Sequence, residues 1–325
     1  MNYLETVKQY NGHDVEQIFF RPMLTGPSAE ELGVRILYNL PLPTCVHLWD
    51  GQRNLLKKFT SSGWTGGDAA KKFQKKIDMH HVKAEMAFSA ADYFSLVYEK
   101  ISARPDVNME DLTGTELEAA ETELFRRAIA ENIRATMWVG DSSKETGLNT
   151  FNGFLTSIKG MVDDEMIAYT SYSATDVEDP AYVITLFDKM WKGVNTRVQD
   201  AKAEGQLAYF VTSDIYYLYE KYLDSMGVDA AYNGTFEGRP ALTYHGIPVI
   251  DVRLGGYLPD TALHQSFALL TDRRNLILAV NTADMPGNEV RMWYNPDEME
   301  NRQRAVFLAG CEIFDESLLY YAYRA

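Results

Sequence analysis

One long, capped, amphipathic helix limits what this chain can fold into more than any other feature of its sequence. Thr115 and Glu118 form a capping box, whose hydroxyl and carboxylate can each accept from an amide that the first helical turn leaves unpaired. Apolar side chains then recur at every fourth position: Phe125, Ile129, Ile133 and Met137. Glu123 and Arg127 are spaced for a surface ion pair, and Gly140 is predicted to end the helix in a left-handed cap. About 25 residues give a helix of roughly 37 Å, which is long enough to act as a spine.

The rest of the second half alternates between predicted helices and strands. A helix is predicted to begin at Asp179-Pro180, because proline suits the first helical position. Its buried stripe consists of Val183, Phe187, Met190, Trp191, Val194 and Val198. A further helix is predicted from Ser213 to about Ser225. Apolar runs predict strands at 207–211, 239–244, 247–252, 267–271, 276–280, 305–314 and 318–323, with a charged loop at 295–304.

The first 88 residues read as two extended segments. Residues 1–44 form an arm that no long helix can cross, since it is interrupted by Pro22, Pro27, Pro41 and Pro43. Within this arm, Ile18–Phe20 and the mainly apolar Val34–Leu37 could pair with a sheet edge or lie over a neighbour, and the alternative is a partly ordered terminus. Residues 45–88 are predicted to form a hairpin with a glycine-rich tip at 61–67 and a return limb at 73–88. So long a hairpin on a compact domain indicates a contact with a neighbour.

The charge is distributed unevenly along the chain. The formal net charge is −15, which argues against a sequence-reading nucleic-acid binder. Residues 47–85, however, carry a net +4, which leaves −19 for the rest. The basic residues of this segment are Arg53, Lys57, Lys58, Lys71, Lys72, Lys75, Lys76 and Lys83. Either they form a solvated face, or the basic hairpin lies across the acidic body of a second copy, where complementary charge sets the register of assembly.

The sequence offers little that resembles a catalytic or metal site. It has no phosphate-binding loop ending in Gly-Lys-Ser/Thr and no Gly-x-Ser-x-Gly elbow. His80 and His81 would point to opposite faces of a strand, and on a helix only His81 and Glu85 would share a face, so a metal site is not predicted. A cytosolic enzyme that uses these three residues stays open as an alternative. No cofactor is indicated.

Cysteine usage and the amino-terminal residues bear on the cellular location. The two cysteines, Cys45 and Cys311, exclude a disulfide framework and a four-cysteine zinc site, and we expect both thiols to be buried in a reducing compartment. The first twenty residues contain charges and no apolar signal region. No apolar run approaches the length of a membrane span, so we expect no membrane association.

The order of these parts resembles the major capsid proteins of tailed bacteriophages. An arm, a long hairpin, a spine helix, an α/β insert and a charged loop between closing strands follow one another in both. The local patterns that carry the resemblance are Phe73–Phe88 with Ser89–Asp92, Leu117–Val139 with Gly140-Asp141 and Gly147–Gly153, Tyr209–Tyr219 with Gly246–Val249, and Asn295–Arg304. The resemblance implies an α+β protein with the Hong Kong 97-type fold, which encapsulin nanocompartments share.

The resemblance also implies a division of the chain into five segments. These are an N-terminal arm (1–44), an extended loop (45–88), a peripheral domain with the spine helix (89–178), an axial domain (179–272), and the closing strands of the peripheral domain (273–325). The implied function is structural, with no catalysis and no metal. Pentamers and hexamers would build an icosahedral shell, the virion capsid, in the bacterial host cytoplasm. The shell would enclose double-stranded DNA without sequence-specific binding.

Further partners and contact residues follow from the same resemblance. Some family members carry an N-terminal scaffolding segment that is cut away, and this chain begins close to the arm, so either a separate scaffold protein or prior removal of such a segment is expected. The resemblance also implies a portal. The candidate inter-subunit contacts are Arg53, Lys57, Lys58, Lys71, Lys72, Lys75, Lys76, Asn295, Asn301, Arg302 and Arg304. Some family members crosslink a loop lysine to a neighbour's asparagine with the help of a glutamate. Lys71, Lys72, Asn295 and Asn301 lie in matching segments, but no glutamate matches, so crosslinking is not expected. An encapsulin-type shell is the alternative within the fold.

Overall fold

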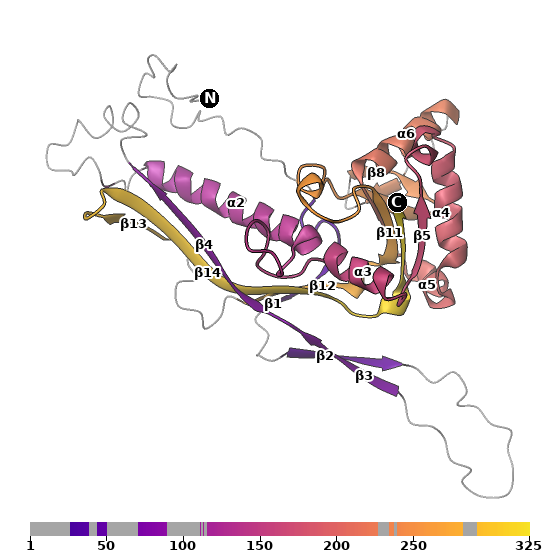
Figure 1. The fold of residues 1–325 in the computed structure, drawn as a ribbon, viewed down its shortest axis with the longest axis horizontal. Helices are drawn as coiled ribbons and strands as arrows, with labels where there is room; N and C mark the ends of the chain where they lie inside the picture. Colours follow the sequence, from indigo (N-terminus) through magenta and orange to yellow (C-terminus); the bar gives the residue numbers. More distant parts are fainter. Residues whose placement is uncertain are drawn as a thin grey trace, which may run out of the picture.

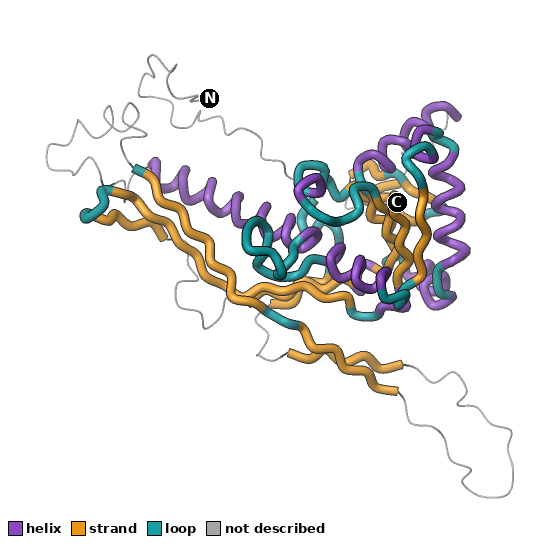
Figure 2. The backbone as a smooth tube through the Cα atoms, in the orientation of Figure 1, coloured by secondary structure: helices purple, strands orange, loops and turns teal. Residues whose placement is uncertain are grey.

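The computed structural model describes residues 27–38, 44–50, 71–89, 111, 113, 116–226, 234–236, 239–281 and 291–325. The described part is elongated (Figures 1 and 2). A long helix and a narrow sheet form one end, and a rounded domain of helices around a second sheet forms the other. A two-stranded hairpin protrudes from the narrow sheet. The α+β class predicted from the sequence is confirmed.

The rounded domain is built on a six-stranded sheet. Its order is β5-β15-β11-β6-β10-β9. The strands are β5 (Ala168–Tyr172), β6 (Leu207–Val211), β9 (Thr243–Tyr244), β10 (Ile247–Asp251), β11 (Phe267–Asp272) and β15 (Leu319–Arg324). β6 and β11 are buried along their whole length, since they are apolar and lie in the middle of the sheet. A small separate pair, β7 (Gly234–Phe236) and β8 (Arg239–Ala241), is antiparallel.

Helices cover both faces of this sheet. Side chains at alternate positions of β6 enter different cores, because successive residues of a strand point to opposite faces. Tyr209 and Val211 pack with one helical layer, whereas Ala208 and Phe210 pack toward Trp138. The helices of the rounded domain are α3 (Phe154–Asp163), α4 (Tyr182–Gly193), α5 (Thr196–Ala201) and α6 (Ser213–Met226).

The predicted stripe from Val183 to Val198 belongs to two helices instead of one. The chain leaves the helical conformation at Val194, and the Asn195 side chain accepts a hydrogen bond from the Arg197 amide at 3.0 Å to start α5. Apolar spacing continues across the break because both helices pack on the same face of the sheet. The start of α4 also lies slightly later than predicted, although the Asp179 carboxylate does accept from the Ala181 amide.

The spine helix is α2 (Glu116–Val139), as the sequence predicted, and its Glu123–Arg127 ion pair is present at 2.8 Å. Thr115 of the predicted capping box lies outside the described residues. The predicted left-handed cap at Gly140 is wrong, because Gly140 does not have a positive φ. Glycine is needed there for space: an added Cβ would collide with the carbonyl oxygen of Phe151. The Gly140 carbonyl accepts bonds from the Gly153 amide and the Thr156 hydroxyl.

Trp138, near the end of α2, is the centre of the core that joins the spine helix to the rounded domain. It is fully buried and contacts Phe154 edge-on, with ring centroids 5.5 Å apart. Phe210 and Phe267 of the six-stranded sheet pack on the same indole, at 5.6 and 6.5 Å. The two ends of the molecule therefore share one apolar core and hold a fixed relative position.

A buried ion pair fastens the same junction. Glu131 and Arg134 are each less than a tenth exposed, and two guanidinium nitrogens donate to the carboxylate at 2.6 and 2.9 Å. Arg134 also donates to the carbonyl of Val252 at 2.9 Å, and the Tyr257 hydroxyl donates to Glu131 at 2.8 Å. Burial and this bond to Glu131 raise the pKa of Tyr257 to about 12. The network ties α2 to the loop after β10.

The narrow sheet runs beneath α2. Its strands are β1 (Arg35–Tyr38), β4 (His80–Phe88), β12 (Leu276–Asn281), β13 (Arg291–Asn295) and β14 (Glu300–Ile313). β14 is the central strand and pairs antiparallel with β4, β12 and β13. β1 adds to β12 in parallel, which confirms that the apolar end of the arm pairs with a sheet edge.

The predicted segments can be placed on this architecture. The six-stranded sheet combines β5 from segment 89–178 and β15 from segment 273–325 with strands of segment 179–272. β15, the last strand of the chain, pairs antiparallel with β11 on the side opposite β6. The division into five segments stays a prediction. Among the described residues, no helix has the length and apolar character to cross a bilayer.

The described cysteine is buried at its sulfur. The Cys311 thiol donates to the Asn152 carbonyl at 2.8 Å, and burial raises its pKa. This agrees with the predicted buried thiol. The side chain of Cys45 lies outside the described residues.

Candidate inter-subunit surface

The hairpin predicted at 45–88 is present at its base. β2 (Thr44–Asp50) and β3 (Lys71–Ile77) pair antiparallel, with Thr44 opposite Ile77 and Asp50 opposite Lys71. The hairpin extends away from the body of the molecule (Figure 1), and its two strands pair with no other described strand. An isolated two-stranded hairpin is marginally stable in water. Its stability would therefore benefit from contact with another surface. The rest of the predicted return limb is β4, which belongs to the narrow sheet.

The candidate lysines of this hairpin differ in their surroundings. The Lys75 ammonium lies 3.3 Å from Glu312 and 3.0 Å from Glu316 of the same chain. Lys76 pairs with Asp78 at 2.7 Å and remains largely exposed. Lys75 is thus engaged within its own subunit. The structure describes only the backbone of Lys71 and Lys72, and Arg53, Lys57 and Lys58 lie outside the described residues.

The base of the hairpin crosses closely over β14. The Ile77 side chain is buried against Ile277 and Ala279 of β12. At Gly310, the backbone of Asp78 and Met79 passes so close that an added Cβ would collide with the Asp78 carbonyl oxygen. With the Lys75 ion pairs, this crossing fixes the direction in which the hairpin leaves the body.

The predicted charged loop at 295–304 is mostly strand. Asn295 ends β13 and Glu300 begins β14, so only residues 296–299 form the turn. β14 alternates in burial through its polar beginning: Asn301 and Gln303 are buried, whereas Arg302 is partly exposed and Arg304 is exposed. This part of the strand was predicted as a loop because amide side chains occupy its inward positions, where apolar residues usually indicate a strand. Gln303 donates to Thr122 of α2 at 3.2 Å.

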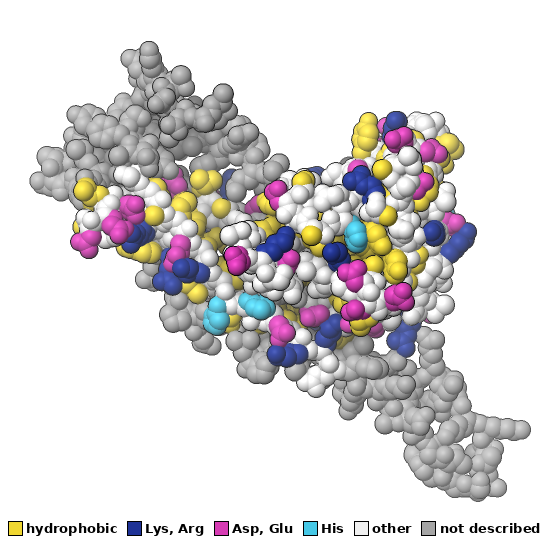
Figure 3. Space-filling view, in the orientation of Figure 1, with side chains coloured by type: hydrophobic (Ala, Val, Ile, Leu, Met, Phe, Trp, Pro, Cys, Tyr) yellow, Lys and Arg dark blue, Asp and Glu magenta, His cyan; other side chains and the backbone are white. Residues whose placement is uncertain are grey.

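The outward residues of this strand pair form a surface of mixed charge, seen at the β13–β14 end of the molecule in Figure 3. Arg302 binds Glu298 and Glu300, and Arg304 lies 3.6 Å from Glu85 on β4. Arg302 and Arg304 are thus placed where a neighbour can reach them. Asn301 is not, because its side chain is fully buried inside the subunit. Its predicted role as a contact residue does not fit this position. Among the contact candidates, Asn295 lies at the end of β13, next to the turn.

The residues of the enzyme alternative lie on β4. His80, His81 and Glu85 are all exposed, and Glu85 is bonded to Lys83, whose ammonium lowers the carboxyl pKa. In the described ranges no three histidine, cysteine or acidic side chains are grouped so that they could hold a metal ion. The arrangement is that of an ordinary solvated strand face.

A groove lies between α2 and β4, with a volume of about 420 Å³. Its lining is mainly apolar and includes Phe125, Ile129 and Ile133 from α2 and Phe307 from β14. The polar residues at its edge are Lys83, Glu85, Asn132, Thr136 and Thr150. This set contains no histidine, serine or cysteine to form a nucleophile with a base. The groove could not be predicted from the sequence, since only the fold brings residues 82–86 against the spine helix.

No protein-family model and no curated protein sequence matches the chain. Solved structures do match it. The capsid of an empty GTA particle has 13% identity and a TM-score of 0.56, with 94% of this chain and 100% of the other covered. The capsid of Myoviridae phage XM1 has 10% identity, a TM-score of 0.57 and 96% coverage of both chains. A Gordonia phage Cozz protein has 13% identity, a TM-score of 0.54 and coverage of 99% and 92%. The chain thus has the fold of phage capsid proteins over almost its whole length.

Proposed function

We propose that this chain is the major capsid protein of a tailed phage or prophage, with the Hong Kong 97-type fold, and that it assembles with copies of itself into an icosahedral shell. The observation that carries the proposal is a fold match that covers nearly all of this chain and of the capsid proteins. A protruding hairpin whose strands pair with no other described strand fits the same role. Such a chain gains stability by placing the hairpin on a neighbour.

The proposal includes the partners and the location. Pentamers and hexamers form a virion shell in the host cytoplasm, with the help of a separate scaffold protein and a portal. The shell encloses double-stranded DNA without reading its sequence. A net charge of −15 supports this part, since an acidic protein surface repels the phosphate backbone and lets the genome leave.

Assembly is the direct test of the proposal. The purified chain is expected to form rings or closed shells, seen by negative-stain microscopy and by light-scattering mass. As the matched control, residues 51–70 are replaced by Asn-Gly, a two-residue turn suited to joining β2 and β3. This variant is expected to keep its melting temperature and to remain small. If both proteins stay small at every concentration, including with an added scaffold from a related phage, the shell proposal is wrong.

The hairpin charge gives a second prediction. Lys71→Glu with Lys72→Glu is expected to reduce the yield of shells strongly at low salt while the melting temperature stays unchanged, because the proposal places this basic hairpin on the acidic body of a neighbour. Lys75 is left intact because it binds Glu312 and Glu316 of its own subunit. Lys189→Glu with Lys221→Glu, at exposed positions of α4 and α6, makes the same change in net charge and serves as the control. Equal shell yields from both double variants would remove the electrostatic part of the proposal.

A further inference from the structure

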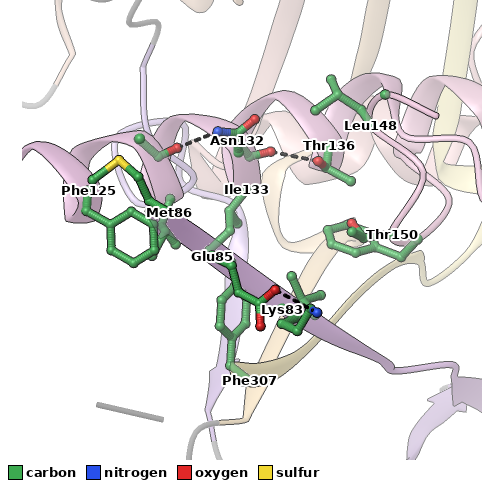
Figure 4. Close-up of a pocket in the computed structure, with 16 residues that line it drawn as sticks. Lys83, Glu85, Met86, Phe125, Asn132, Ile133, Thr136, Leu148, Thr150 and Phe307 are labelled. Atoms are coloured by element: carbon green, nitrogen blue, oxygen red, sulfur yellow. Dashed lines mark hydrogen bonds and ion pairs between the residues drawn. The ribbon is translucent and has the colours of Figure 1, made fainter. Parts of the chain in front are cut away.

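The groove between α2 and β4 has one wall made by the edge of a strand (Figure 4). Five consecutive residues of β4, from Val82 to Met86, line it. Alternate side chains of a strand point to opposite faces, so a run of five consecutive residues indicates that the backbone of β4, at the edge of the described sheet, borders the groove. In Figure 4, Phe125 and Ile133 of α2 and Met86 of β4 lie in the space between helix and strand.

That edge is open among the described residues. β4 pairs with β14 on one side and with no described strand on the other. A strand edge presents unpaired N–H and C=O groups that can accept an added strand. Beside it, Val82, Ile129 and Ile133 are only partly buried, so the groove also offers apolar surface to alternate side chains of such a strand. The apolar side of α2 and the unpaired edge of β4 together fit an extended, apolar peptide.

We propose that residues 15–20 of the same chain, Val-Glu-Gln-Ile-Phe-Phe, occupy this groove as an added strand on β4. This segment contains three adjacent large apolar residues, Ile18 to Phe20, which an apolar groove can bury. Burial of their apolar surface favours the docked arm. The inference concerns the single chain and holds whether or not the chain forms a shell.

The length of the arm fits an occupant from the same chain. The described chain begins at Pro27, and Leu32 and Val34 pack in the same core as Met137 and Trp138 at the C-terminal end of α2. The groove runs back along this helix from Thr136 to Phe125, a rise of roughly 17 Å. Seven extended residues reach about 23 Å, so a chain that runs back from Pro27 can enter the groove by Phe20.

Cysteine pairs test this position. Ala128→Cys on the α2 wall is combined with a cysteine at 18, 19 or 20, in a Cys45→Ser background that keeps buried Cys311. Under mild oxidation we expect a disulfide within one chain, with the yield at 19 differing about fivefold from the yields at 18 and 20, because a strand alternates its faces. Tyr217→Cys, on an exposed position of α6, replaces Ala128→Cys as the control and should give no disulfide.

Each other outcome contradicts the inference. Equal yields at all three positions would mean that the arm samples the groove without forming a strand, and no disulfide would mean that it lies elsewhere. A disulfide that joins two chains would assign the groove to a second copy. As an independent measurement, deletion of residues 2–20 is expected to raise the maleimide labelling rate of Ala128→Cys about tenfold, which corresponds to about 1.4 kcal/mol of docking. An unchanged rate would overturn the proposal even if a cysteine pair failed to fold.

Discussion

Replacing Arg134 with alanine is expected to lower the free energy of unfolding by about 3–5 kcal/mol, because it leaves the buried Glu131 carboxylate without its counter-charge. The change also removes the donors to the carbonyls of Val252 and Arg253 and loosens the junction between α2 and the rounded domain. Chemical denaturation followed by circular dichroism and by tryptophan fluorescence measures it, since Trp138 lies in the adjoining core.

Two further variants test whether the expected loss of stability comes from the unpaired buried charge. Arg127→Ala removes the exposed partner of Glu123 on the same helix, and a surface pair of this kind is worth about 0.3–0.5 kcal/mol. The double variant Arg134→Met with Glu131→Leu leaves no unpaired charge and is expected to recover most of the stability that Arg134→Ala loses. If the double variant is as unstable as the single one, packing of the long arginine side chain is the cause, and the charge argument is wrong.

The sequence predicted this helix well and gave no sign of its most important pair. Phe125, Ile129, Ile133 and Met137 follow the helical period, and such a local pattern does not depend on the rest of the fold. Glu131 and Arg134 look like ordinary surface charges in the sequence. They are buried because Tyr257 and the carbonyl of Val252 arrive from more than a hundred residues away. Only the tertiary structure decides whether a charge pair is exposed or buried.

At the candidate inter-subunit surface, too, only the features that depend on neighbouring residues could be predicted from the sequence. The pairing of β2 with β3 and the basic character of the hairpin could be inferred, because both depend on neighbouring residues. The strand at Glu300–Arg304 could not, since its inward positions hold Asn301 and Gln303, which carry no apolar signal. Gly310 gives no signal either: it is one glycine in an apolar strand, and its purpose appears only when the Asp78 backbone crosses it.

Gly310→Ala is accordingly expected to abolish shell formation while it costs only about 1–3 kcal/mol of stability, the usual range for an extra methyl group in a filled site. The added Cβ would meet the carbonyl oxygen of Asp78, so the link between β3 and β4 has to move. Microscopy and light scattering report assembly, and thermal unfolding reports stability. Gly160→Ala on α3 is the control: its Cβ has open space, and alanine favours a helix by about 0.5–1 kcal/mol.

Assembly is expected to suffer more than stability, because the hairpin is held at its base and a small change of direction there moves its far end by a larger distance. Its direction is fixed at one end by Ile77 against β12 and by the Lys75 ion pairs, and its strands extend away from the body. A small shift at Asp78 therefore becomes a larger displacement at the far end. In a shell every subunit repeats the same contact, so a misdirected hairpin is repeated at every interface. Normal shells from Gly310→Ala, with a lowered melting temperature, would show that the hairpin takes its direction from the neighbour and not from this crossing.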